Sequence, residues 1–84
     1  MIKSFRCADT QALFETGRGR QFSGVVNVAI RKLAQLDAAQ TLELLRAPPG
    51  NRAGQYSIRV NDQFRVCFRW TEAGPEDVEI VDYH

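Results

Sequence analysis

The stretch Tyr56–His84 constrains the fold most, because its apolar residues recur at every second position in three successive runs. Asn61 and Asp62 separate the first two runs and are typical of a tight hairpin turn. Residues 71–77, TEAGPED, predict a turn of about seven residues before the third run begins at Val78. A period of two places alternate side chains on opposite faces of a sheet, so we expect antiparallel strands here.

The same alternation divides the middle strand into two faces. One face carries large apolar side chains whose burial is strongly favourable, so it is expected to face the core: Phe64, Val66, Phe68 and Trp70. The opposite face is expected to carry arginines and an aromatic ring: Arg59, Arg65, Arg69 and Tyr83. Cations hold phosphates and rings stack bases, so this face predicts a platform for single-stranded RNA.

Upstream of Tyr56 the apolar residues follow the period of a helix. A main amphipathic helix is predicted over residues 24–38, with Ser23 as its N-cap. Its apolar face consists of Val26, Ala29, Ile30, Leu33 and Leu36. A shorter helix through residues 13–15 is expected to be capped by Asp9 or Thr10 and to end at Gly17. Residues 41–48, TLELLRAP, predict a further helical turn, and residues 1–5 predict a first strand.

These elements predict an α+β fold, with two N-terminal helices packed on one face of a small, mainly antiparallel sheet of about four strands. A chain of 84 residues favours a single domain over residues 1–84. No apolar run approaches the roughly 20 residues that span a bilayer, and the first residues hold no apolar signal core, so a cytoplasmic location is expected. Cys7 and Cys67 are far apart, which predicts neither a disulfide nor a zinc site.

Arginine dominates the positive charge of the chain. Nine of the 11 basic residues are arginine, although the formal net charge is only +1. The planar guanidinium binds phosphate through two hydrogen bonds, but an arginine-rich composition can also reflect genome base content. The segment GRGRQ, with Arg18 and Arg20, is open to the same two interpretations: a phosphate or acidic-partner site, or a solvated turn. The low net charge argues against a free-standing nucleic-acid-binding domain.

The residues that remain for chemistry are arginine and the terminal group Asp82, Tyr83 and His84. The sequence contains no metal-ligand cluster, phosphate-binding glycine loop or serine triad, and no cofactor is expected. The set suits RNA cleavage by the RNA's own 2′-hydroxyl, which needs a base, an acid and cations for the phosphate charge. His84 titrates near neutrality and can serve as acid or base. Arg65 can stabilise the phosphate charge, and Tyr83 can stack or donate a proton. Asp82 can orient His84 or the neighbouring strands, or take a proton itself.

Each of these residues also has a structural interpretation. A terminal His84 is often frayed, and Tyr83 can be edge packing. Arg65 can be a solvated cross-strand partner of Glu79 or Asp62. Asp82 shares its alternation with the apolar positions 78 and 80, so it is expected on the core side, where it can serve as a structural hydrogen-bond acceptor.

The chain resembles the HigB toxins of the RelE-like superfamily, and within them the Pseudomonas-type HigB/GraT branch. The resemblance is carried by segments that run in order along nearly the whole chain: MIKSF, LFETG, RKLAQLDAA, TLELLRAPPGN, GQYSIRVNDQFRVCFRW and VEIVDYH. It implies a RelE-like fold and a ribosome-dependent endoribonuclease that cuts translated mRNA. It also implies a HigA-like helix-turn-helix antitoxin as partner, with operator DNA bound only through the antitoxin complex.

By matched positions the resemblance implies four catalytic residues, Arg65, Asp82, Tyr83 and His84. Together with the sequence pattern it leaves Arg52, Arg59 and Arg69 as RNA-binding candidates. One departure matters, because relatives carry a further segment of several residues, including a lysine, between the Pro-Gly turn and Arg52. Arg52 is the candidate to replace that lysine. The departure also motivates an alternative function, a degenerate toxin-like module that binds its antitoxin or the ribosome without cleaving RNA.

Overall fold

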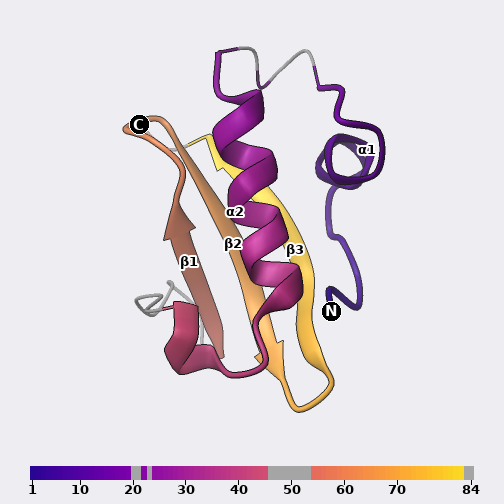
Figure 1. Cartoon of the computed structure of the whole chain (residues 1–84), viewed down its shortest axis with the longest axis vertical. Coiled ribbons are helices and arrows are strands. Elements are labelled where there is room, and N and C mark those ends of the chain that lie inside the picture. The colour runs from indigo at the N-terminus through magenta and orange to yellow at the C-terminus, as the bar shows by residue number, and fades with distance from the viewer. Residues whose placement is uncertain (20–21, 23, 46–53, 83–84) are drawn as a thin grey trace.

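Among the residues that the structure describes, two α-helices, a short 3-10 helix and a three-stranded antiparallel sheet confirm the predicted α+β fold. The computed structural model describes residues 1–19, 22, 24–45 and 54–82. The helical elements are α1 (Ala8–Thr16), α2 (Val26–Ala38) and the short 3-10 helix η2 (Leu42–Leu45). The strands are β1 (Gln55–Arg59), β2 (Phe64–Thr71) and β3 (Gly74–Asp82), in the spatial order β1-β2-β3. Figure 1 shows α2 lying across one face of the sheet and α1 on the β3 side.

The predicted strand at residues 1–5 is present only as a single parallel bridge between Phe5 and Val78. The segment still follows β3, because the Lys3 amide donates to the Pro75 carbonyl and the Val78 amide donates to the Ser4 carbonyl. These bonds fix the start of the chain beside β3 without extending into a regular ladder. In the described part of the chain, the sheet therefore has three strands where about four were expected.

The β2–β3 connection is shorter than the predicted turn of about seven residues. β2 continues to Thr71 and β3 begins at Gly74, which adopts a φ of 127° that favours glycine. Further along, Cys67 lies opposite Glu79 but Arg69 lies opposite Glu76, so β3 holds one extra residue in a β-bulge. Asp77, at a φ of 52°, lies in this interval. The bulge therefore includes Asp77, which the sequence analysis assigned to the turn at residues 71–77.

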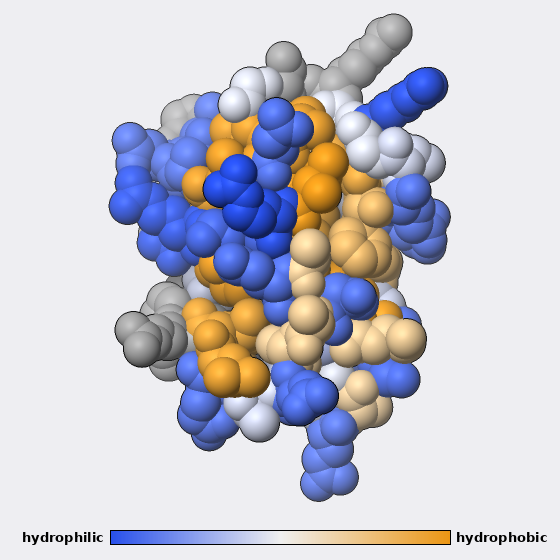
Figure 2. Space-filling view, viewed as in Figure 1, coloured by the Kyte–Doolittle hydropathy of each residue, from blue (hydrophilic) through white to orange (hydrophobic). Residues whose placement is uncertain are grey.

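The core lies between α2 and the inner face of the sheet. Val66 and Phe68 of β2 are fully buried, as are Leu33 and Leu36 of α2. The predicted apolar faces of the helix and the middle strand are thus confirmed, with Trp70 half-buried at the edge of the core. In Figure 2, hydrophobic residues reach the surface over η2, where Leu44 is 71% exposed. In the described part of the chain, no helix is long and apolar enough to cross a membrane.

The start of α1 differs from the sequence prediction. Its N-cap is Cys7, with no side-chain capping bond, and Asp9 and Thr10 both lie inside the helix. The fully buried Thr10 hydroxyl instead accepts a hydrogen bond of 2.9 Å from the Ile80 amide, which ties α1 to β3. The predicted end of the helix at Gly17 is confirmed by a left-handed φ of 74°. The start of α2 also differs, because its N-cap is Val25, with no side-chain capping bond, and not the expected Ser23. Ser23 itself and the Pro-Gly turn at residues 48–51 lie outside the described residues.

Candidate functional site

The sheet face that points away from α2 carries the predicted arginines. Arg65 lies directly opposite Arg59 in the β1–β2 register, and Arg69 follows four residues further along β2, opposite Gln55. All three alternate with buried core residues, so they share the outer face, which we call the arginine face. Arg59 and Arg69 are exposed, whereas Arg65 is half-buried. The structure therefore brings these three predicted residues together on one surface.

Two arginines directly opposite each other repel, and the structure separates their charged groups. Arg59 forms an ion pair with Asp62 in the hairpin turn. Arg65 donates a hydrogen bond from Nη1 to Ser57 Oγ at 3.2 Å. Ser57 lies two residues from Arg59 on β1, so the Arg65 side chain leans along the strand toward the centre of the face. Arg59 and Arg65 therefore reach polar partners at different places.

A fourth arginine, Arg6, joins this face from the start of the chain. The bridge between Phe5 and Val78 places Arg6 beside Glu79, with 3.7 Å between Arg6 Nε and Glu79 Oε2. Sequence reasoning missed this residue, because the contact joins opposite ends of the chain and leaves no periodic signal. The suggested pairing partners of Arg65 thus have arginine partners of their own: Glu79 pairs with Arg6, and Asp62 with Arg59.

Cys67 lies near the middle of the arginine face, opposite Ser57 on β1 and Glu79 on β3. Burial raises the pKa of its thiol, the Glu79 carboxylate raises it further, and Arg65 acts in the opposite direction. A raised pKa keeps the thiol protonated at neutral pH, so Cys67 is a poor nucleophile. The two opposing charges show that Arg65 and Glu79 both lie close to the centre of this face.

Asp82, the other described catalytic candidate, lies on the opposite side of the sheet. It pairs with Phe64 in the β2–β3 register and is exposed, with Gln63 Nε2 donating to its Oδ2 at 3.3 Å. This agrees with the core-side orientation expected from its alternation. It borders a pocket of about 230 Å³ with a second carboxylate, Asp9, and an apolar floor. The floor consists of Phe22, Phe64 and Ile80.

The two described catalytic candidates therefore come from one end of the sheet but from its two faces. Arg65 lies near the start of β2, and Asp82 ends β3 beside it. The remaining predicted site residues, Arg52, Tyr83 and His84, lie outside the described residues, as does Arg20. Arg18, the other arginine of the predicted basic turn, is exposed just after α1.

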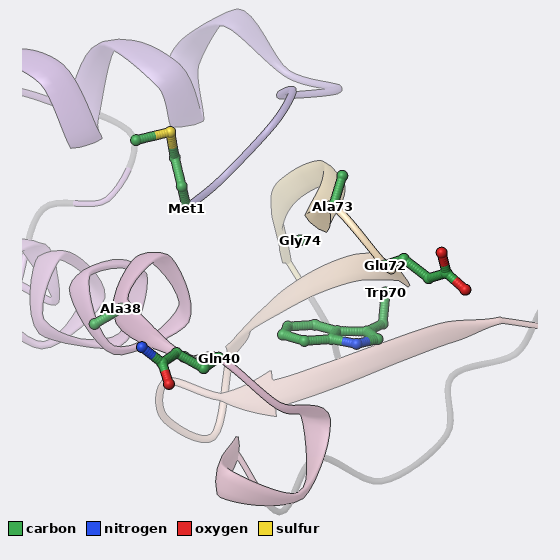
Figure 3. Close-up of a pocket in the computed structure, with 8 residues that line it drawn as sticks. Met1, Ala38, Gln40, Trp70, Glu72, Ala73 and Gly74 are labelled. Atoms are coloured by element: carbon green, nitrogen blue, oxygen red, sulfur yellow. The ribbon is translucent and has the colours of Figure 1, made fainter.

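A second pocket, of about 330 Å³, lies at the other end of β2. Figure 3 shows the Trp70 indole in this pocket, directed toward Ala38 and Gln40 near the end of α2, with Glu72 and Ala73 on the hairpin side. None of the predicted site residues that the structure describes lines this pocket. Within the described ranges, no group of three or more His, Cys, Asp or Glu residues is placed to hold a metal ion.

Comparison with known proteins identifies relatives along most of the chain. Residues 3–84 match the family described as the RelE-like toxin of the type II toxin-antitoxin system HigB. The chain is also similar to toxin HigB-1 of Vibrio cholerae serotype O1, with 47% identity over 58 residues. That alignment covers 60% of this chain and 61% of the relative, so the chain spans less than two thirds of the relative's length.

Proposed function

Because the chain belongs to the family of RelE-like HigB toxins of type II toxin–antitoxin systems, we propose that it is an endoribonuclease. Its substrate is translated mRNA on the ribosome, and its cleavage inhibits translation. The observation that carries the proposal is the arginine face, where Arg65 Nη1 lies 3.2 Å from Ser57 Oγ. Arg59 lies opposite Arg65 on β1, and Arg69 lies further along β2 on the same face. A guanidinium held in place on a sheet face that carries several arginines suits a phosphodiester better than a small neutral ligand.

In the proposed reaction, the 2′-hydroxyl of the mRNA attacks the adjacent phosphate and the 5′ oxygen leaves. Negative charge gathers on the phosphate oxygens during the attack, and Arg65 stabilises it as a preorganised cation. Arg59 and Arg69 bind the neighbouring phosphates, and Arg52 is a further candidate for this role. His84 and Tyr83 supply proton transfer or base stacking, as the sequence predicts.

Asp82 acts from the other face of the strand in this proposal. Its carboxylate lies on the helix side, where it accepts a bond from Gln63, so it suits orienting the end of β3 better than direct contact with the phosphate near Arg65. Asp82 would then position the residues that follow it, which are the proposed proton-transfer groups.

The proposed partners follow from the type II system. An antitoxin of the HigA-like helix-turn-helix class would neutralise the toxin, and operator DNA would be bound only through the antitoxin complex. The ribosome supplies most of the binding energy for mRNA, since a protein of net charge +1 makes too few phosphate contacts to hold RNA tightly alone. Free RNA is therefore expected to bind weakly.

The test is to add the purified protein to a translating extract and to map mRNA 5′ ends by primer extension. We expect cleavage of the translated mRNA and none when initiation is blocked beforehand. Induction in cells should arrest growth, and co-expression of the antitoxin should relieve the arrest. Growth arrest with intact mRNA at every dose would refute the endoribonuclease and favour the alternative module that binds without cleaving.

A further inference from the structure

We propose that Ser57 is a positioning residue for the reaction, acting through Arg65. The inference rests on the proposed endoribonuclease function and concerns how its principal cation is oriented. Arg65 Nη1 donates to Ser57 Oγ at 3.2 Å, across the β1–β2 pair. Ser57 is 6% exposed, so its hydroxyl is almost fully withdrawn from water and is held in the middle of β1.

Because Ser57 is buried, breaking its hydrogen bond to Arg65 is unfavourable in free energy. A buried hydroxyl that loses its partner leaves a polar group without water, so the free energy favours keeping the bond formed. Arginine has a long, flexible side chain, and fixing such a side chain during the reaction is entropically unfavourable. The bond to Ser57 fixes part of that side chain before RNA arrives.

The arginine pair formed by Arg59 and Arg65 across the two strands determines which way the Arg65 side chain points. Arg59 lies directly opposite Arg65 and repels its guanidinium, while Asp62 draws the Arg59 side chain toward the hairpin turn. Ser57 lies on the other side of Arg59 along β1, toward Cys67 and Glu79. The guanidinium of Arg65 is therefore directed to the centre of the arginine face, away from the turn. A phosphate bound there meets a preoriented cation.

A matched pair of variants separates the hydroxyl from its volume. Ser57→Thr keeps the oxygen, whereas Ser57→Val has nearly the same shape as threonine but accepts no hydrogen bond, and both are favoured in strands. We expect the valine variant to cleave mRNA about 10- to 100-fold more slowly than the threonine variant at saturating ribosome concentration. The ribosome concentration for half-maximal rate should differ little between them. Ser57→Ala, which fits any strand position, should resemble the valine variant.

The Arg65→Ala background tests whether Ser57 acts through Arg65. Removing the Ser57 hydroxyl there should cause no further loss of cleavage, because the group that it orients is absent. A structural role alone would lower activity and melting temperature equally in both backgrounds. Equal rates for the threonine and valine variants, beside an active wild type, would overturn this inference and leave the proposed function standing. A wild-type protein that never cleaves mRNA would overturn both.

Discussion

The two faces of β2 are held in different ways. On the inner face, Phe64, Val66 and Phe68 are at most 7% exposed and contact α2 and each other in one hydrophobic cluster. On the outer face, Arg65 and its neighbours are kept in place by polar contacts, such as the bond from Arg65 to Ser57 and the ion pair of Arg59 with Asp62. Stability should therefore depend mainly on the inner face and activity on the outer one, although both belong to the same strand.

The largest expected effect is on the inner face. Phe68→Ala removes a fully buried ring, and we expect it to lower the free energy of unfolding by about 3–5 kcal/mol. The neighbouring Arg69→Ala, on the exposed outer face, should change stability by no more than about 0.5 kcal/mol. Urea denaturation of both variants measures the contrast. Comparable losses would show that the two faces do not differ in this way.

A smaller effect is expected where the start of the chain meets the sheet. An alanine Cβ at Gly74 would lie 2.5 Å from the Met1 carbonyl oxygen, and the φ of 127° is unfavourable for alanine. Gly74→Ala should therefore cost about 1–3 kcal/mol and weaken the bonds that hold residues 3–6 along β3. Arg6 would then leave Glu79. Hydrogen exchange of the Arg6 and Val78 amides is the measurement. Gly54→Ala is the control, because its φ is also positive but an alanine Cβ there lies within 4 Å of no atom of the described residues. Unchanged exchange in the Gly74 variant would contradict this packing.

The smallest effect concerns the electrostatics at the centre of the arginine face. Because burial and Glu79 raise the pKa of Cys67, the folded protein keeps the thiol proton at a pH where an ordinary thiol loses it. The associated stabilisation is present below the ordinary thiol pKa and is lost as pH rises through the raised value.

Alkylation by iodoacetamide, in a Cys7→Ser background, reports this pKa directly. Near pH 9, Cys67 should react more slowly in the folded protein than in urea, because the thiolate is the reactive species. Glu79→Gln should accelerate the reaction and Arg65→Ala should slow it, since Glu79 raises the pKa and Arg65 lowers it. Mass spectrometry of the modified peptide gives the rates. Identical rates in the two variants would show that neither charge lies near the thiol.

The spacing of apolar residues along the sequence predicted much of this architecture. The alternation at residues 64–70 assigns Phe64, Val66 and Phe68 to the core and the arginines to the outer face, and both assignments agree with the register. Apolar residues at helical spacing likewise predicted the buried face of α2. These features are local, because each depends on the spacing of residues within one helix or strand and not on which helices and strands contact each other.

The sequence analysis missed contacts between residues far apart in the chain. Thr10 looks like a helix cap, yet its hydroxyl is taken by the Ile80 amide of β3. Arg6 carries no motif and reaches the arginine face only because residues 3–6 follow β3. The bulge near Asp77 depends on the pairing of two strands, and residues typical of turns concealed it. Ser57 drew no attention, because a serine in a strand has no signal of its own.

Substitution of Arg65 is the most direct test of the claim that stability depends mainly on the inner face of β2 and activity on its outer face. The measurement is the rate of mRNA cleavage in a translating extract for Arg65→Ala, with Arg69→Ala as a matched control on the same strand and face. The account predicts a loss of about 10²- to 10³-fold for Arg65→Ala and a much smaller loss for Arg69→Ala. The melting temperature should be unchanged in Arg69→Ala and modestly lower in Arg65→Ala, because the buried Ser57 hydroxyl loses its partner there. An Arg65→Ala variant that cleaves mRNA as fast as the wild type would contradict the account.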